Sequence, residues 1–470
     1  MKGGGIKFGT DGWRGVIGED FTLANVELVA GAAAAFVLSD RQYLHNRKIL
    51  VSFDRRFLSE QAAERAAAVF CSAGLETHLC SSPFPSSAVS LLTAEKYGLG
   101  VQVTASHNPY YYNGVKFKWK GGSAPAGLMA GLERHLGARL SRRARPAAPA
   151  QVSHDGQYLE YLRSRVSLRR VAARLRAPVA LDFMHGCAAG YLEKLFRPGT
   201  FRALRSGRDA FFGMSAPEPV EAGLKGLAAG VRASKAACGF AFDGDGDRFA
   251  VFDEKGRYLS PPVVFGLVCD YVINFRGGRG PVVQSVSMGR LSASIAARAG
   301  LPVEETYVGF KALAERLRAG DAVAAAEESG GYTWKGNLPE RDGLVTALLF
   351  MEMLAETRLS LSALTRRLAK EHGPSHYLRR DLALLAAAPD KAETSRRLRA
   401  RLPARPLGLR VVRVSELDGV KLTFEDGGWL LIRPSGTEPL VRIYSETPSA
   451  PATAALVELA VKAVRKEGLA

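Results

Sequence analysis

The sequence contains few cysteines and no long apolar run. Its five cysteines, scattered through 470 residues, form no C-x-x-C pair. This argues against a disulfide framework and a zinc site, and it favours a reducing, cytoplasmic location. No stretch of about eighteen consecutive apolar residues is present, so we expect no membrane-spanning helix and no membrane partner. The N-terminus, MKGGGIKFGTDGWRG, lacks an apolar segment, so no secretory signal is expected.

Acidic residues are scarce relative to basic ones. There are 64 Lys and Arg against 46 Asp and Glu, a formal net charge of +18. Much of the excess is arginine in Ala/Leu-rich segments such as RRLRARLPARP, which is typical of a solvated helix face. No basic run is interleaved with aromatic residues as in single-strand binders. We therefore expect no nucleic-acid partner, although a basic surface suits phosphate esters.

Apolar runs in the first third of the chain alternate between strand-like and helix-like patterns. Residues 48–53, 76–80 and 99–105 are predicted to be strands, with helices between them, the first of which Ser59 would cap. This order implies an α/β fold with a parallel sheet covered by helices. Ligands in such sheets lie beyond the carboxyl ends of the strands, and Ser106 follows the third strand at such an end.

Three aspartates, Asp243, Asp245 and Asp247, alternate with glycines in the sequence DGDGDR. In an extended or tightly turned segment their side chains converge, and three carboxylates repel one another unless a cation lies among them. Oxygen ligands favour Mg²⁺ or Ca²⁺ over zinc. An EF-hand is rejected because its sixth position, a glycine in that motif, is Arg248 here. The alternative is a simple Asp/Gly turn, which needs only one or two such residues.

A second motif, RPSGTEP, lies between two predicted strands near the C-terminus. It supplies the guanidinium of Arg433, the hydroxyls of Ser435 and Thr437, and a flexible backbone at Gly436. Such a loop can hold an anion with its side chains and N–H groups. The alternative is a Pro/Gly turn without a ligand.

Ser106 lies in VTASHNP, which is compatible with a turn, a nucleophile or a phosphate carrier. No G-x-S-x-G elbow is present, and His107 is poorly placed to act as a base on its neighbour, which disfavours a serine hydrolase. A serine that carries a phosphoryl group opposite a cation held by three aspartates is chemically coherent. Arg14 and Lys116 are cations that could assist, although each alone is more often a solvated charge.

With these motifs assembled, the sequence resembles the α-D-phosphohexomutase superfamily of phosphoglucomutases, phosphomannomutases and phosphoglucosamine mutases. TASHNP, DGDGDR, EESGG and RPSGTEP occur in the family's order. The resemblance implies an isomerase that transfers phosphate intramolecularly, with four domains around a central cleft. With the composition shifts along the chain, it predicts related mixed α/β domains over 1–146, 147–256 and 257–372, and a smaller α+β domain over 373–470.

The resemblance also implies roles for individual residues. Ser106 would be the phosphoserine, and its phosphate and the three aspartates would bind Mg²⁺. Arg248 would lie close to the phosphoserine, with Arg14 as a further active-site arginine and His107 and Lys116 in acid–base help. The residues expected to bind the sugar and its non-transferred phosphate are Glu327, Ser329, Arg433, Ser435, Gly436 and Thr437.

The sugar is predicted from finer differences. Phosphoglucosamine mutases usually carry QSGH where this chain has ESGG, so Glu328 and Gly331 argue against an amino sugar. The segment YVGFK resembles glucose-type mutases, with Lys311 placed to meet a phosphate. We therefore expect a phosphoglucomutase that works through glucose 1,6-bisphosphate, as a monomer or homodimer. The alternatives are a phosphomannomutase, a bispecific or other sugar-phosphate mutase, and, least favoured, a non-catalytic phosphosugar- or nucleic-acid-binding scaffold.

Overall fold

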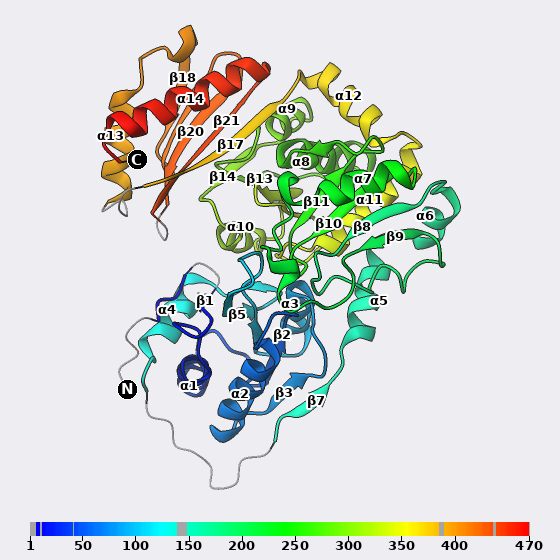
Figure 1. Cartoon of the computed structure of the whole chain (residues 1–470), viewed down its shortest axis with the longest axis vertical. Helices are drawn as coiled ribbons and strands as arrows, with labels where there is room; N and C mark the ends of the chain where they lie inside the picture. Colours follow the sequence, from blue (N-terminus) through cyan, green and yellow to red (C-terminus); the bar gives the residue numbers. More distant parts are fainter. Residues whose placement is uncertain are drawn as a thin grey trace. The chain divides into compact units, whose positions relative to one another are not determined.

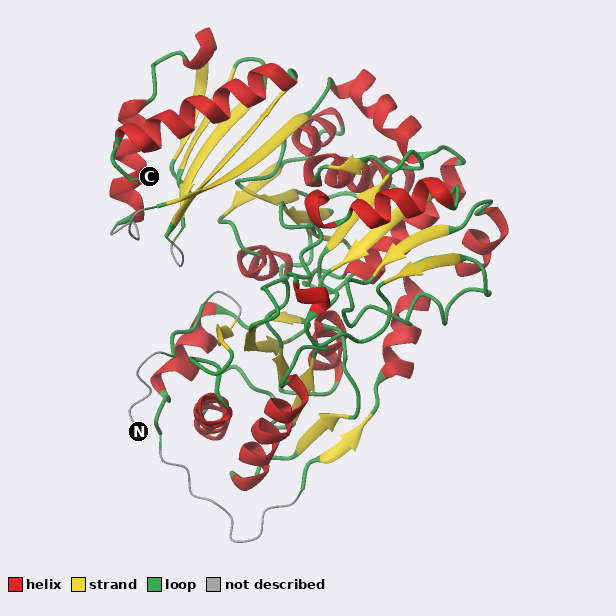
Figure 2. Cartoon of the chain, in the orientation of Figure 1, coloured by secondary structure: helices red, strands yellow, loops and turns green. Residues whose placement is uncertain are grey.

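The computed structural model describes residues 6–9, 12–40, 42–138, 148–384, 390–435 and 439–469. The chain forms two compact units, and each is built from two stretches of sequence. Unit 1 comprises residues 1–259 and 330–361, and unit 2 comprises residues 260–329 and 362–470. The mixed α/β architecture predicted from the sequence is confirmed, with several separate sheets (Figure 2).

The first sheet of unit 1 has the strand order β1-β5-β4-β2-β3-β7, with β6 paired to β5. The three predicted parallel strands are present as β2, β3 and β4, and antiparallel β5 and β1 extend the sheet. Helices α1 and α2 pack against each other, and α3 contacts β4 and β5 (Figure 1). The bounds are β1 Gly12–Val16, α1 Leu23–Ser39, β2 Ile49–Phe53, α2 Ser59–Ser72, β3 Thr77–Cys80, α3 Ser86–Glu95, β4 Leu99–Val103, β5 Tyr112–Trp119, β6 Gly122–Ser123, α4 Ala126–Arg134 and β7 Ala150–Val152.

The start of α2 differs from the prediction. Its N-cap is Leu58, in the left-handed region at φ 63°, and Ser59 is the first helical residue. The Ser59 hydroxyl donates to Oδ1 of buried Asp54 at 2.6 Å and so does not cap the helix. The serine does mark the start of the helix, but the buried carboxylate competes for its hydroxyl.

The second sheet of unit 1 has the order β12-β11-β10-β8-β9. Strands β8, β9 and β10 run parallel, and β10 and β11 form an antiparallel pair on either side of DGDGDR. Helix α11 contacts β11, and its Phe350 packs against Phe240 and Phe249. The bounds are α5 Asp155–Arg165, α6 Leu168–Arg174, β8 Val179–Asp182, β9 Phe201–Leu204, α7 Lys225–Ala233, β10 Cys238–Phe242, β11 Phe249–Phe252, β12 Tyr258–Leu259, β16 Gly331–Trp334 and α11 Gly343–Thr357.

Unit 2 begins with a parallel group in which β13 lies between β14 and β15. Helices α8 and α9 pack against each other, and α10 contacts β13 and β15. The bounds are α8 Pro261–Asp270, a π-helical turn η3 Tyr271–Phe275, β13 Val282–Ser285, α9 Arg290–Arg298, β14 Val303–Thr306, α10 Phe310–Leu317, β15 Ala324–Glu327 and α12 Leu361–His372.

The C-terminal part of unit 2 is an antiparallel sheet in the order β17-β21-β20-β19-β18. Helices α13 and α14 pack on the sheet, where Leu456 and Val461 of α14 meet Leu430 and Ile443 in one core (Figure 1). This is the α+β domain that the sequence predicted. The bounds are β17 His376–Ala383, α13 Lys391–Arg401, β18 Val411–Ser415, β19 Val420–Phe424, β20 Trp429–Pro434, β21 Leu440–Thr447 and α14 Ala450–Lys466.

Two features bear on the sequence expectations about compartment and membrane. All five cysteines are buried and free. Among the helices of the described residues, none combines the length and the hydropathy that crossing a bilayer requires. The predicted linker at 141–151 lies largely outside the described residues, except that its end forms the first residues of β7.

Candidate active site

Ser106 lies in the loop that follows β4, at the carboxyl end of the strand as predicted. It is fully buried and adopts a left-handed backbone conformation with φ 56°. Its Oγ donates to Oδ2 of Asp243 at 2.8 Å, and its N–H donates to Oγ1 of Thr104 at the same distance. The fold therefore brings the candidate phosphate carrier directly to the aspartate cluster.

The three aspartates occupy the turn between β10 and β11. Asp243, Asp245 and Asp247 are buried, and one oxygen of each lies within 4.8 Å of the other two. Among the described residues, Oδ1 of Asp245 is buried without a hydrogen-bond partner. Convergent oxygens with an unpartnered lone pair fit a hard divalent cation such as Mg²⁺.

The protein supplies its own positive charges to this cluster. Lys116 is buried on β5, and its Nζ lies 2.8 Å from Oδ2 of Asp245 and 3.2 Å from Oδ2 of Asp247. Arg341, which was not predicted from the sequence, also contacts the cluster, with Nε 3.0 Å from Oδ1 of Asp247. Its only sequence signal is a charged residue just before the apolar helix α11.

These neighbours set the protonation of the cluster. Burial, Asp247 and Asp245 together raise the pKa of Asp243 well above its usual value. Burial also acts on Asp247, but Arg341 and Lys116 outweigh it and hold the pKa of that carboxyl well below its usual value. Likewise burial opposes the charge on Lys116, but Asp245 and Asp247 outweigh it and raise its pKa. Lys116 is thus an ammonium at neutral pH.

The three remaining predicted residues of unit 1 surround the Ser106 loop. Arg14, on β1, donates from Nη1 to Oδ1 of Asn108 at 2.5 Å. Arg248 donates its backbone N–H to Oδ1 of Asp243 at 3.0 Å, and its Nη2 lies 3.4 Å from Nε2 of His107. Burial first and Arg248 second lower the pKa of His107 well below its usual value, so its imidazole is neutral.

The predicted sugar-binding pair lies in unit 2, at the carboxyl end of β15. Glu327 accepts a hydrogen bond at Oε1 from the Ser329 hydroxyl at 2.5 Å. Its neighbour Glu328 is buried and is fully engaged with the protein. It accepts from three hydroxyls, those of Ser287 at 2.5 Å and of Ser285 and Tyr444 at 3.2 Å each.

The predicted phosphate loop follows β20 in the same unit. Arg433 donates from Nε to Oδ2 of Asp418 at 2.7 Å, and its Nη1 is buried without a partner among the described residues. The backbone N–H of Ser435 donates to the Leu440 carbonyl at 2.9 Å, which begins the pairing of β20 with β21. Gly436 and Thr437 lie outside the described residues.

Asp418 is a second residue that was not predicted from the sequence. Besides Arg433, it accepts the backbone N–H of Val308 at 2.9 Å and binds Lys391. Burial opposes its charge, but Arg433 outweighs burial and lowers the pKa of Asp418. Asp418 thus ties the phosphate loop to the YVGFK segment, in which Lys311 lies in the first turn of α10. Its sequence signal is an Asp-Gly turn between two strands.

Four family models match the chain in order. Domains I, II and III of phosphoglucomutase/phosphomannomutase, each described as alpha/beta/alpha, match residues 5–141, 156–256 and 263–372, and the C-terminal domain matches residues 384–463. The chain belongs to the phosphoglucomutase/phosphomannomutase family. It is therefore a phosphohexomutase-type enzyme, an isomerase that transfers phosphate intramolecularly.

Similar proteins cover nearly the whole chain. A "Phosphoglucomutase/phosphomannomutase" of Thermococcus kodakarensis is 29% identical over 97% of this chain and 98% of its own length. A "Probable phosphoglucosamine mutase" of Thermococcus gammatolerans is 30% identical over 98% of this chain and 99% of its own. The crystal structure of a "putative phosphomannomutase" from Thermus thermophilus is 30% identical, with a TM-score of 0.85 over 98% of this chain and 99% of that chain.

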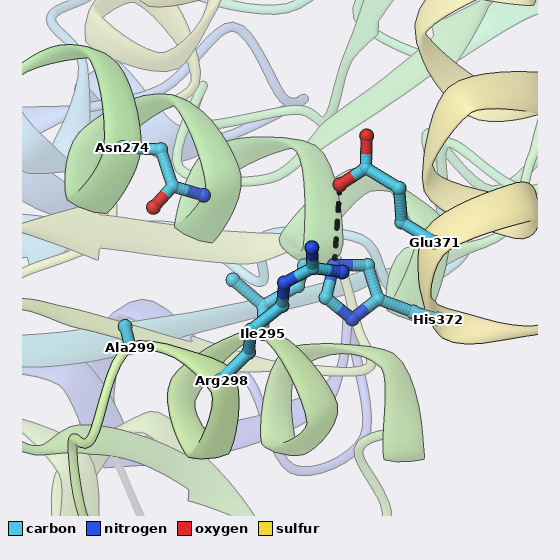
Figure 3. A pocket seen from close by; sticks show the side chains of 6 residues that line it. All are labelled: Asn274, Ile295, Arg298, Ala299, Glu371 and His372. Carbon is cyan, nitrogen blue, oxygen red and sulfur yellow. Dashed lines mark ion pairs between the residues drawn. The ribbon is translucent and has the colours of Figure 1, made fainter.

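Unit 2 also contains a surface pocket of about 270 Å³ away from the family motifs (Figure 3). It lies beside η3, α9 and the end of α12, and Arg298, Asn274, Glu371 and His372 line it, with Nε2 of His372 4.0 Å from Oε2 of Glu371. Arg298 and Asn274 are exposed, and a cationic and an acidic side chain, Arg298 and Glu371, both line the pocket. It offers no concentrated charge of one sign and is not part of the candidate site.

Proposed function

We propose that this family member is a phosphoglucomutase that interconverts glucose 1-phosphate and glucose 6-phosphate through a phosphorylated Ser106. The observation that carries the proposal is the buried hydrogen bond from Ser106 Oγ to Asp243, inside a group of three convergent carboxylates. A buried serine beside a cation site has the components that phosphoryl transfer requires.

The residues that would hold Mg²⁺ are Asp243, Asp245 and Asp247 together with the phosphate on Ser106. When bound, the cation neutralises charge on the transferring phosphoryl group. The unpartnered Oδ1 of Asp245 supports this assignment.

In the forward direction, the phosphoryl group leaves Ser106 Oγ and bonds to the sugar hydroxyl oxygen, which gives glucose 1,6-bisphosphate. The hydroxyl proton needs an acceptor, and His107, whose buried Nδ1 has no partner among the described residues, is the candidate. Lys116, held as an ammonium, balances the negative charge left on the serine oxygen. In the second half, the other phosphate returns to Ser106, and its sugar oxygen recovers a proton.

The substrate would be held by groups of unit 2. Glu327 can accept from adjacent sugar hydroxyls, with Ser329 beside it. Arg433 has a free donor for the non-transferred phosphate, to which Ser435, Gly436, Thr437 and Lys311 would add. The free cysteines suit a reducing compartment, so we place the enzyme in the cytoplasm.

The choice of glucose rests on the YVGFK segment and its Lys311. Mannose phosphate is the second candidate, because the similar Thermus structure is called a "putative phosphomannomutase". Glu328 gives only weak support for glucose over an amino sugar, because its carboxylate already accepts hydrogen bonds from three protein hydroxyls.

The test is a coupled mutase assay with Mg²⁺ and catalytic hexose bisphosphate on the 1-phosphates of glucose, mannose, glucosamine and ribose. We expect the highest kcat/KM on glucose 1-phosphate and loss of turnover with a chelator. A preference for glucosamine or ribose phosphate would overturn the glucose assignment. Release of inorganic phosphate faster than isomerisation would overturn the mutase assignment.

A further inference from the structure

A single buried arginine donates hydrogen bonds to the backbone of the loop that carries Ser106. Arg56 follows β2 by three residues and is fully buried. Its Nη2 donates to the carbonyl oxygens of Ser106 at 2.5 Å and Asn108 at 2.7 Å. Its Nη1 donates to those of Pro109 at 2.9 Å and Tyr112 at 3.2 Å. One guanidinium thus satisfies four carbonyls between residues 106 and 112.

Arg56 is itself fixed by Asp54, which is also fully buried. Oδ2 of Asp54 lies 3.2 Å from Nε of Arg56, and Oδ1 accepts the backbone N–H of Arg56 at 3.0 Å. Asp54 also accepts the hydroxyl of Thr104 at 2.6 Å, and Thr104 Oγ1 in turn accepts the N–H of Ser106. The network therefore holds both the N–H and the carbonyl of Ser106.

The backbone of Ser106 needs such support. A residue other than glycine at φ 56° is in a sparsely populated and strained backbone region, which persists only when its surroundings fix it. Buried carbonyls also require donors, since leaving one unsatisfied is costly. A lysine could not replace Arg56, because its point charge lacks the planar fork that reaches four oxygens.

We propose that Arg56 is a positioning residue for the reaction at Ser106, which fixes the nucleophile's backbone so that Oγ points at the aspartate cluster. Every hydrogen bond and ion pair of Arg56 described above goes to Asp54 or to the loop, so it acts through Ser106 and not through the sugar. The inference rests on the proposed phosphoserine function. It predicts that Arg56 affects phosphoryl transfer to and from Ser106 far more than it affects sugar binding.

The test compares Arg56→Lys with Arg55→Lys. Arg55 is the matched control, because it is the neighbouring residue and donates to the carbonyl of Ser206 away from the loop. Two readouts are needed: kcat and KM in the mutase assay, and the rate at which glucose 1,6-bisphosphate phosphorylates the dephosphorylated protein, followed by intact mass. In that loading step a phosphorus–oxygen bond to the sugar breaks, one to Ser106 forms, and the serine proton goes to the released sugar oxygen.

We expect Arg56→Lys to lower kcat and the loading rate by about 100-fold, the effect of misplacing a reacting group by about 1 Å. KM should stay within about threefold, and Arg55→Lys should match the wild type. Wild-type kcat and loading in Arg56→Lys would overturn the proposal. The proposal would also be overturned if the loss of activity in Arg56→Lys were no larger than the fraction of unfolded protein measured by circular dichroism.

Thr104 provides a second test that does not depend on the folding of an arginine variant. Thr104→Val removes the acceptor for the Ser106 N–H, whereas Thr104→Ser keeps it. We expect slower loading in the valine variant and recovery in the serine variant, and equal rates in the two would overturn the proposal. A wild-type protein that neither isomerises any sugar phosphate nor takes up phosphate would instead refute the proposed function itself.

Discussion

The two charged clusters of the molecule differ in how many charged groups of the protein surround them. In unit 1, Ser106, Lys116 and Arg248 each contact an aspartate of the cluster, and Arg341 contacts Asp247. In unit 2, Arg433 has one described partner, Asp418, and a buried Nη1 without any. The first cluster is a dense network that leaves Oδ1 of Asp245 without a hydrogen-bond partner among the described residues, whereas the second is sparse and leaves a donor.

This difference follows from the tasks proposed for the clusters. Three buried carboxylates disfavour one another's charge, which contributes to the raised pKa of Asp243, so cations of the protein are needed beside them whether or not a ligand is bound. A group that binds and releases a phosphate twice in a cycle must not be saturated by the protein. The lesson is that a dense network of opposite charges accompanies the proposed chemistry, and a sparsely paired buried donor accompanies the proposed phosphate site.

The largest expected effect removes the centre of the prepared cluster. Ser106→Ala should lower mutase turnover by more than about 1,000-fold, as expected for loss of a covalent nucleophile. The assay is glucose 1-phosphate isomerisation, with intact mass to confirm that no phosphate is taken up. Ser81→Ala, on an exposed serine, is the control. Retained turnover in Ser106→Ala would show that the buried serine is not the carrier.

A second prediction concerns how the buried carboxyl of Asp342, beside Arg341, lowers the free energy of unfolding at neutral pH. Burial raises the pKa of Asp342, the N-cap of α11 and neighbour of Arg341, to about 6. In the unfolded chain the pKa of an aspartate is about 3.9. The native state therefore holds this proton more tightly, and the free energy of unfolding falls as the pH rises from about 4 to about 6. Asp342→Asn should remove this loss, up to about 3 kcal/mol.

The measurement is the free energy of unfolding of the wild type and of Asp342→Asn at pH 4 and pH 7. The free energy of unfolding of the variant should increase relative to that of the wild type as the pH rises. Asp390→Asn, at the exposed N-cap of α13, controls for the amide exchange in a cap. A difference between wild type and Asp342→Asn that does not change with pH would contradict the prediction.

The third prediction concerns the cluster of unit 2, where Asp418 orients Arg433. Asp418→Asn weakens the charge-assisted bond that orients Arg433, while Arg433 itself stays in place. We expect KM for the sugar phosphate to rise about tenfold, equivalent to about 1.4 kcal/mol, with kcat nearly unchanged. Asp426→Asn, in the turn between β19 and β20, is the control. A fall in kcat at constant KM would mean that Asp418 acts in the chemical step.

The smallest effect is expected at Glu328, which belongs to unit 2 but, like the aspartates of unit 1, is held by several groups of the protein. Glu328→Gln should change the ratio of kcat/KM between glucose and glucosamine phosphates by less than about threefold, because the side chain is occupied by protein hydroxyls. Gly331→His, assayed in the same way, tests the other position at which ESGG differs from the QSGH of phosphoglucosamine mutases. A large switch in preference from Glu328→Gln would restore it as a specificity residue.

The sequence predicted most of the residues that the fold brings together around Ser106 in unit 1, because their motifs are local. DGDGDR places three carboxylates in one turn, and Ser106 follows a strand whose end could be located. Arg341, Asp418 and Arg56 could not be found in this way, since each is distant in sequence from the groups it contacts. Asp54 and Arg56 had a faint signal, as charged residues directly after a buried strand in the same parallel sheet as the Ser106 strand.

The split of unit 1 into two stretches of sequence has a consequence for how the protein is made. The core of the second sheet is completed by Phe350 of α11 against Phe240 and Phe249. Residues 260–329, which belong to the other unit, emerge from the ribosome between these aromatic residues. The aspartate turn, near the middle of the chain, is therefore synthesised before α11, the helix that completes the core of its sheet.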